Sequence, residues 1–217
     1  MPFPLPRLSR DDFASELAPL SPEPLSSGVM DSLYSYYQEL GRWNEKLNLI
    51  GPGTAGEILA RHFGESLAAL PFLPAEAKSG LDLGSGAGFP GLVLAASRPG
   101  LEMTLVEARE RKWAFLLSAA RRASLSSRCL NVRVRLPLPS GLPESLDVIT
   151  SRALRLDPDV WGALSRRLGA EGRIILWVGE QDPDLPPDLA ACGDVRLAGS
   201  DRRRILVLRR VEGRREP

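Results

Sequence analysis

The stretch Leu81-Asp82-Leu83-Gly84-Ser85-Gly86-Ala87-Gly88-Phe89-Pro90-Gly91 decides the fold of this chain. A short apolar run leads into a turn with glycine at every second position. A helix then starts at Pro90, whose missing N–H group costs nothing in the first turn. Glycine permits positive φ angles and lets the backbone approach a ligand closely. The stretch therefore predicts either a nucleotide-type crevice at the carboxyl end of a strand or a tight turn without a ligand.

The overall composition limits the class of protein. The 217 residues are enough for one α/β domain with an appendage. The 28 Lys and Arg nearly cancel the 27 Asp and Glu, so any nucleic-acid footprint has to be local. Cys129 and Cys192 lie far apart without metal-ligand spacing, which predicts reduced thiols and no metal site. No apolar run approaches the ~20 residues of a membrane span, and we expect a cytoplasmic monomer without membrane contact.

The residues before the glycine stretch predict an N-terminal arm and a helical cap. Residues 1–27 carry six prolines and should form a mostly extended arm, with one short helix around 11–18. Apolar residues recur at helical spacing over 30–47 and again over 58–70. We therefore divide the chain into the arm and cap, residues 1–75, and a second domain, residues 76–217.

Strands and helices alternate in the second domain. We expect strands at 80–83, 102–107, 130–135, 146–151 and 173–178, separated by helices at 90–97, 109–124 and 157–168. This order predicts an α/β fold with a parallel sheet covered on both faces. Segments 194–198 and 204–210 are strand-like and joined by a short polar link, which predicts a terminal antiparallel hairpin. Seven strands in a Rossmann-like sheet that ends in such a hairpin are the plan of class I S-adenosylmethionine (SAM) methyltransferases, not of a plain dehydrogenase.

Two charged residues follow predicted strands. Glu107 closes the second strand about 20 residues after the glycines, where a carboxylate accepts hydrogen bonds from a ribose diol. Glu107 could also cap the helix at 109–124, and the two roles are compatible. Arg152 ends the fourth strand and faces the same crevice, so it should contact the carboxylate of SAM or a phosphate, or else form a salt bridge at the rim.

Four blocks of sequence, spanning residues 42–153, resemble the ribosomal RNA small subunit methyltransferase G (GidB) family. They are Arg-Trp-Asn-Glu-Lys-Leu-Asn-Leu at 42–49, Arg-His-Phe-Gly-Glu-Ser-Leu at 61–67, the glycine stretch with its Phe-Pro-Gly ending, and Ser-Arg-Ala at 151–153. The resemblance implies SAM-dependent methylation of guanine N7 in 16S rRNA, near the decoding region. The partner would be 16S rRNA, the small ribosomal subunit or its assembly intermediate.

The glycine turn, the carboxylate after the second strand and the family resemblance together give a set of expected SAM-binding residues. These are Gly84, Gly86, Gly88, Phe89, Glu107, Arg152 and, just after the third strand, Leu136 and Pro137. No residue is a certain catalyst, and His62 and Arg152 are the candidates. His62 could form a wall of the active site or touch RNA, or it could be an ordinary packing histidine.

The residues also fit the chemistry of a ring nitrogen. Guanine N7 carries a free lone pair, so its methylation needs alignment of the reactants rather than a general base. The chain has one histidine and no Ser/His/Asp or Cys/His set. Its fourth strand ends Thr150-Ser151-Arg152-Ala153 and lacks the Asp/Asn-Pro-Pro-aromatic turn expected for methylation of an exocyclic amine.

Departures from the family pattern keep other functions open. The lysine of the family's Lys-Gly pair is missing before Gly179, and no acid occurs in the segment 135–139. One alternative is a SAM methyltransferase with a different substrate, and another is a non-catalytic rRNA-binding assembly factor. An NAD-dependent oxidoreductase would need a sizeable substrate domain and a proton-relay residue, and the chain supplies neither.

Binding to RNA would need positive charge on one part of the surface. Basic residues concentrate in two places, although charge runs are often only solvated faces. One is the helix at 109–124, with Arg109, Arg111, Lys112, Arg121 and Arg122. The other is the terminal hairpin and tail, with Arg202, Arg203, Arg204, Arg209, Arg210, Arg214 and Arg215.

Overall fold

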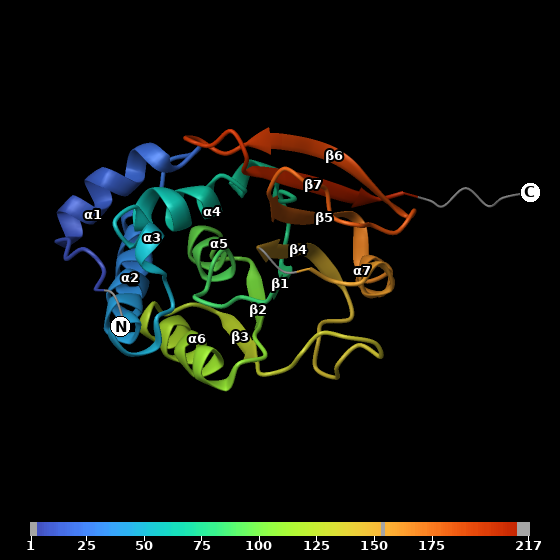
Figure 1. The fold of residues 1–217 in the computed structure, drawn as a ribbon, viewed down its shortest axis with the longest axis horizontal. Coiled ribbons are helices and arrows are strands. Elements are labelled where there is room, and N and C mark those ends of the chain that lie inside the picture. The colour runs from blue at the N-terminus through green and yellow to red at the C-terminus, as the bar shows by residue number, and fades with distance from the viewer. Residues whose placement is uncertain (1–3, 153–154, 212–217) are drawn as a thin grey trace, which may run out of the picture.

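The computed structural model describes residues 4–152 and 155–211, which fold around one seven-stranded sheet (Figure 1). The strands are Ser79–Leu83 (β1), Glu102–Val106 (β2), Ser127–Leu130 (β3), Leu146–Arg152 (β4), Leu168–Val178 (β5), Leu189–Arg196 (β6) and Arg204–Arg210 (β7). Their order in the sheet is β3-β2-β1-β4-β5-β7-β6. The first five strands run parallel, and β7 is antiparallel to both β5 and β6. The predicted sheet with a terminal hairpin is confirmed. Ala153, Arg214 and Arg215 lie outside the described residues.

Apolar side chains cover both faces of the central strands, as a parallel sheet enclosed by helices requires. Neighbouring residues of one strand pack into different clusters. Val148 of β4 and Ile175 of β5 belong to the cluster on one face, and Ile149 and Ile174 belong to the cluster on the other. All four side chains are fully buried. This double burial explains why these strands are continuous apolar runs in the sequence.

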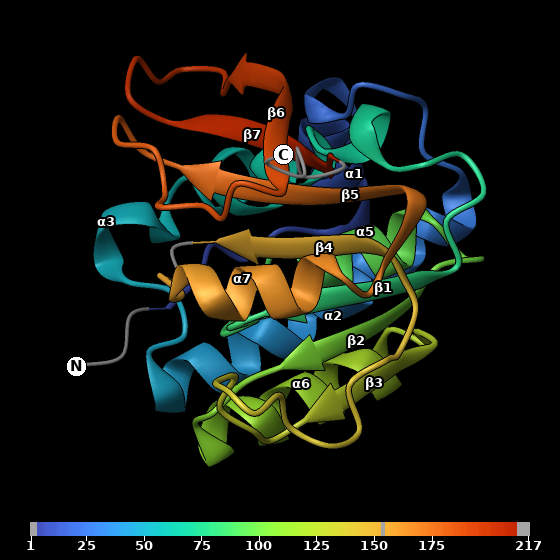
Figure 2. The same ribbon diagram turned by 90° about the vertical axis from the view of Figure 1, so that its right-hand side faces the viewer.

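Helices enclose the sheet from both sides (Figure 2). On one side lie α2 (Ser27–Leu47), α5 (Gly91–Ser97) and α6 (Glu110–Arg122), and on the other lies α7 (Pro158–Ser165). Figure 2 shows α7 in front of β4, with α2 and α5 behind the sheet. Within the described ranges, no helix has the length and apolar character needed to cross a bilayer.

The short helix predicted in the N-terminal arm is confirmed, and the arm holds one further helical turn that was not predicted. Residues Arg10–Leu17 form helix α1, and a 3-10 turn, η1, follows at Ala18–Leu20. Ser9 caps α1 by accepting a hydrogen bond from the N–H group of Asp12, 3.1 Å away. Phe13 and Leu17 are fully buried against the rest of the cap. The prolines of this segment indicate an extended chain, but burial of Phe13 and Leu17 stabilises the helix.

The cap continues through a chain of short helical turns. Helix α2 ends at Asn48, which adopts a left-handed conformation with φ of 49° that asparagine tolerates. The following turns are α3 (Pro52–Ala55), the π-helical turn η2 (Leu59–Gly64), α4 (Glu65–Leu67) and the 3-10 turn η3 (Leu70–Phe72). The segment predicted as helical at 58–70 is therefore helical, but it is wound partly as a π-helix.

The third strand was predicted at 130–135, and this placement is wrong. β3 is Ser127–Leu130 and ends opposite Val106, the last residue of β2. Beyond that point no strand of the described residues pairs with the chain. Val132 and Val134 still pack against the core cluster under α7, which explains why the apolar alternation resembled a strand.

The strands near the end of the sheet start earlier than predicted. β5 begins at Leu168 rather than at residue 173, and β6 spans Leu189–Arg196 rather than 194–198. Register shifts interrupt the pairing between Leu146 and Val148 and between Ala191 and Gly193. Bulges of this kind break the period-2 pattern on which sequence reading depends.

Replacing Phe13 by alanine should destabilise the protein by about 3–5 kcal/mol, because a fully buried aromatic side chain is lost. Its ring centre lies 5.1–5.5 Å from those of Tyr34, Tyr37 and Phe63. The free energy of unfolding in urea measures the effect. Glu16→Ala, an exposed change on the same helix, is the control. Equal stabilities of the two variants would show that α1 does not belong to the core.

Candidate functional site

The glycine turn joins β1 to α5 at the carboxyl edge of the sheet. Gly84, Gly86 and Gly88 have φ angles of 70°, 56° and 93°, as predicted. A Cβ atom on Gly88 would lie 2.6 Å from Leu92 Cδ1, so this glycine is needed for packing. A Cβ on Gly86 would make only ordinary contacts, 3.7 Å from Gly84 O and 4.0 Å from Lys112 Nζ, and Gly84 is exposed while Gly86 is half-buried. The backbone at Gly86 is therefore accessible to a ligand.

Asp82 of β1 supports the start of α5 after the glycine turn, and the sequence analysis did not identify it as a site residue. Its side chain is fully buried, and Oδ1 accepts a hydrogen bond of 2.7 Å from Thr150 Oγ1. A Cβ on Gly91 would approach Asp82 Oδ2 to 2.7 Å, so glycine lets α5 start directly on this carboxylate. Burial raises the pKa of Asp82 to about 6. The signal in the sequence that could have identified it is an acidic residue between two leucines of a buried strand.

Glu107 brings a buried carboxylate against the glycine turn at Gly86. Oε2 accepts from the N–H of Gly86 at 3.1 Å, and Oε1 accepts from the N–H of Arg109 at 2.7 Å. Asn131 Nδ2 donates to the main-chain oxygen of Glu107 at 2.9 Å. Glu107 thus supports the start of α6 and also lies against the glycines, and its contact with a ribose stays a prediction.

Leu136 and Pro137 are not brought to this cluster by any hydrogen bond or ion pair among the described residues. They lie in the segment between β3 and β4, and Leu136 is 47% exposed. Their assignment to the residues just after the third strand followed from placing that strand too late. The residue that follows β3 and contacts Glu107 is Asn131.

Arg152 lies in a charged cluster around the buried carboxylate of Glu65. Its Nη2 donates to Glu65 Oε2 at 2.7 Å and to the main-chain oxygen of Arg61 at 2.8 Å. Arg203 pairs closely with Glu65 Oε1, and Arg61 Nε lies 3.3 Å from the same oxygen. Trp177 Nε1 donates to the main-chain oxygen of Glu65 at 2.8 Å. We call these five residues the Glu65 cluster.

The Glu65 cluster leaves part of Arg152 free. Its Nη1 is buried and has no hydrogen-bond partner among the residues described. Burial, together with the neighbouring Arg61, lowers the pKa of Arg152 to about 10. The salt bridge considered from sequence is therefore present, and one nitrogen of the guanidinium has no partner among the described residues.

His62 lies on η2, beside the Glu65 cluster. Its Nε2 is 2.9 Å from Thr54 Oγ1, and its ring centre is 5.1 Å from that of Phe89. Burial and the positive charges of Arg152, Arg61 and Arg203 lower the pKa of His62 to about 3. The imidazole is therefore neutral near pH 7. π-Helical turns of this kind are frequent at functional sites.

Phe89 and Tyr36 join the turn to the cap. The ring of Phe89 lies 5.1 Å from that of Phe63 and 5.4 Å from that of Tyr36. Tyr36 donates a hydrogen bond from its hydroxyl group to the main-chain oxygen of Ala87. The predicted site residues thus form two groups: the glycines with Glu107, and His62 with Arg152. Phe89 is in contact with both.

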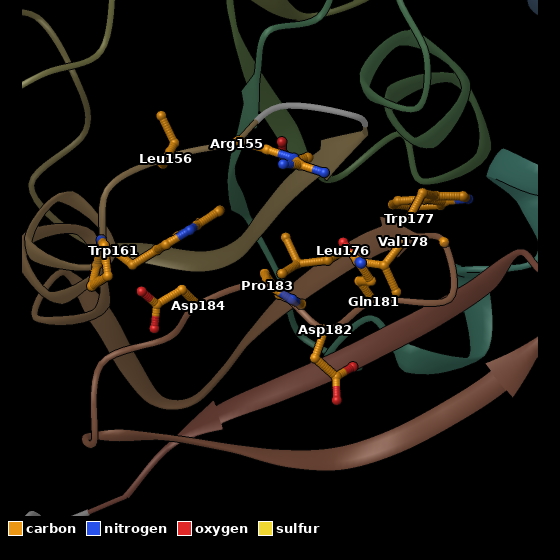
Figure 3. A pocket seen from close by; sticks show the side chains of 13 residues that line it. Arg155, Leu156, Trp161, Leu176, Trp177, Val178, Gln181, Asp182, Pro183 and Asp184 are labelled. Carbon is orange, nitrogen blue, oxygen red and sulfur yellow. The ribbon is translucent and has the colours of Figure 1, made fainter.

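A pocket of about 620 Å³ opens at the carboxyl ends of β4 and β5 (Figure 3). Trp161 of α7 and Asp184 lie at one end of it and Trp177 at the other, with Leu176 and Pro183 between them. Ser151, which pairs with Leu83 at the end of β1, also lines it. The pocket therefore adjoins the glycine turn on the side of the sheet covered by α7.

Comparison with known sequences identifies relatives with one shared name. The family model described as rRNA small subunit methyltransferase G matches residues 30–184. Ribosomal RNA small subunit methyltransferase G of Desulfotalea psychrophila is 36% identical over 181 residues, covering 82% of this chain and 81% of the relative. The protein of the same name from Anaeromyxobacter dehalogenans is 38% identical over 156 residues, 70% of each chain. The one from Jannaschia sp. is 41% identical over 134 residues, 60% of this chain and 62% of the relative.

Solved structures show the same fold at low sequence identity. A variant of MtNAS in complex with S-adenosylmethionine superposes with a TM-score of 0.58 at 15% identity, covering 85% of this chain and 74% of that one. TrmN from Thermus thermophilus gives 0.54 at 21%, covering 70% and 53%. A SAM-dependent methyltransferase from Aquifex aeolicus gives 0.56 at 14%, covering 72% and 94%. The sheet is therefore of the class I methyltransferase type.

The single histidine of the chain should remain neutral in the folded protein between about pH 8 and about pH 5. Its pKa is about 3 when folded and 6.5 when unfolded. The neutral ring therefore adds stability that is fully present above pH 6.5 and is lost as the pH falls toward 3. An NMR titration of the imidazole measures this, with the urea-unfolded chain as control. A midpoint between pH 6 and 7 in the folded protein would contradict it.

Proposed function

The chain belongs to the rRNA small subunit methyltransferase G family, and we propose that it transfers the methyl group of SAM to N7 of a guanine in 16S rRNA. The observation that supports this best is the carboxylate of Glu107 held at the N–H group of Gly86 in the glycine turn, in a chain of this family. The substrate would be 16S rRNA within the small subunit or its assembly intermediate. The protein would act as a monomer in the cytoplasm.

The residues at the turn fit SAM. The partly exposed backbone at Gly84 and Gly86 would lie against the cofactor, and Glu107 is there with its carboxylate buried and its oxygens oriented by two N–H groups. A carboxylate in this position accepts hydrogen bonds from the two hydroxyls of a ribose. We assign Gly84, Gly86, Gly88 and Glu107 to SAM, and Phe89 to the wall between cofactor and cap.

The chemistry requires little of the protein beyond alignment. When bound, SAM supplies an electrophilic methyl group on a sulfonium, which guanine N7 takes up with its lone pair without losing a proton. No general base is needed, and a neutral, buried His62 is suited to a wall rather than to proton transfer. Arg152 would hold an anionic group, the carboxylate of SAM or a phosphate, with its free Nη1.

The surface charges favour one side of the crevice for RNA. In the terminal hairpin, Arg202 pairs with Glu180, Arg203 with Glu65, and Arg204 with both Asp182 and Asp194. These guanidinium groups are largely engaged within the protein. By contrast, Arg109, Arg111 and Lys112 at the start of α6 have no ion pair with any described residue.

Lys112 links this basic group to the site. Its Nζ lies 4.0 Å from the position that a Cβ on Gly86 would occupy. The start of α6 therefore places positive charge at the edge of the crevice, where an RNA backbone that delivers its base to the site would pass. We propose that the phosphates are bound at the start of α6 rather than by Arg202, Arg203 and Arg204 of the hairpin.

Small subunits from a strain that lacks this gene should be methylated by the protein and labelled SAM at one guanine N7, which borohydride and aniline cleavage would map.

Glu107→Gln should bind SAM about tenfold more weakly in calorimetry, because one charge-assisted hydrogen bond is lost. Glu110→Gln, an exposed change on α6, is the control. Binding of SAM without transfer to any rRNA would overturn the proposal.

Neutralising the start of α6 should weaken RNA binding. Arg111→Gln should lower the affinity for the small subunit and reduce the slope of log affinity against log salt by about one, since one phosphate contact is lost. Arg121→Gln, an exposed arginine at the other end of the same helix, should leave the slope unchanged. Equal slopes for both variants and the wild type would exclude this face as the RNA contact.

A further inference from the structure

We propose that the pocket between α7 and the segment 179–188 holds the target guanine, and that Asp184 recognises it as guanine. This inference rests on the proposed function and adds the place and the chemistry of the acceptor base. Enzymes that modify a base extrude it from its stack into a fitted pocket. A volume of about 620 Å³ is in the range of pockets that hold a molecule of nucleoside size.

The position of the pocket suits an acceptor of the methyl group. Ser151 pairs with Leu83 in the sheet, and its hydroxyl lies 3.3 Å from the main-chain oxygen of Leu83. Leu83 directly precedes Gly84, so the side of the pocket lined by Ser151 lies beside the strand that leads into the glycine turn. From there the pocket extends across Leu176 of β5 to Trp161 of α7 (Figure 3).

The lining of the pocket is mixed in the way a purine requires. Leu156, Leu176, Val178 and Pro183 give apolar walls for the faces of the base. Polar groups occur at its edges, among them Arg155 and Asp184. A few polar groups on an apolar pocket fix the orientation of a ligand and give its specificity.

The two carboxylates of the segment differ in their partners. Asp182 is paired with Arg204 and points toward β7 in Figure 3. Asp184 has no hydrogen bond or ion pair from its carboxylate to any described residue, and Figure 3 shows it next to Trp161. The far end of the pocket therefore carries an unpaired carboxylate.

The orientation of guanine in this pocket follows from its two edges. N1–H and the N2 amine are adjacent donors, and one carboxylate can accept from both. N7 lies on the opposite side of the ring system. A guanine with its N1/N2 edge at Asp184 therefore directs N7 away from Asp184, toward the part of the pocket lined by Leu176 and its sheet partner Ser151. Adenine presents an acceptor at N1, which a carboxylate repels.

The test compares guanosine with inosine, which keeps N1–H and N7 but lacks the N2 amine. Reconstituted small subunits would carry one or the other at the methylated position. The wild type should prefer guanosine by about tenfold in kcat/KM, the effect of one hydrogen bond to a charged group. Asp184→Asn should lower kcat/KM on guanosine by about tenfold to a hundredfold and lose most of the preference.

Asp159→Asn, an exposed carboxylate on α7 that does not line the pocket, is the matched control and should keep both the rate and the preference. Calorimetry with SAM should give the same affinity for all three proteins. An Asp184→Asn variant with the wild-type rate and preference would overturn the inference alone, as would equal losses in the control. Absence of methylation by the wild type would overturn the proposed function, and the inference with it.

Discussion

The carboxylate of Glu65 is 5% exposed and is shared by guanidinium groups from three separate parts of the chain. Arg61 comes from the cap, Arg152 from the end of β4 and Arg203 from the hairpin link. A buried charge is tolerated only with such partners, and removing one side of the pair typically costs 3–5 kcal/mol. The cap, the parallel sheet and the hairpin are therefore bound to each other at one point. The crevice has a defined shape because that point is fixed.

The conformation of the glycine turn depends on the cap as much as on the sheet. Tyr36 of α2 holds the main-chain oxygen of Ala87, and Phe89 packs between His62, Phe63 and Tyr36. The glycine turn by itself has few side chains to hold it. Residues of the cap supply them, so changes on α2 would be transmitted to the turn without touching a ligand.

The sequence contained the features that depend on local conformation and burial. The glycine turn, the helices and the terminal hairpin were all predicted, because positive φ angles and apolar periodicity are local signals. The end of β3 was not, since it is set by where the neighbouring β2 stops. Arg203 was grouped with residues facing RNA, but it lies against Glu65, more than a hundred residues away in the chain. Pairings over such separations leave no pattern in one sequence.

The position of β7 inside the sheet has a consequence for synthesis. β7 lies between β5 and β6 although it follows every other strand in the chain, and Ile205, Leu206, Val207 and Leu208 are buried there. Until these residues leave the ribosome, β5 has an unpaired edge and Glu65 lacks Arg203. A nascent chain can therefore hold the glycine turn well before the crevice is complete. The seven-stranded sheet is complete only when translation has passed β7.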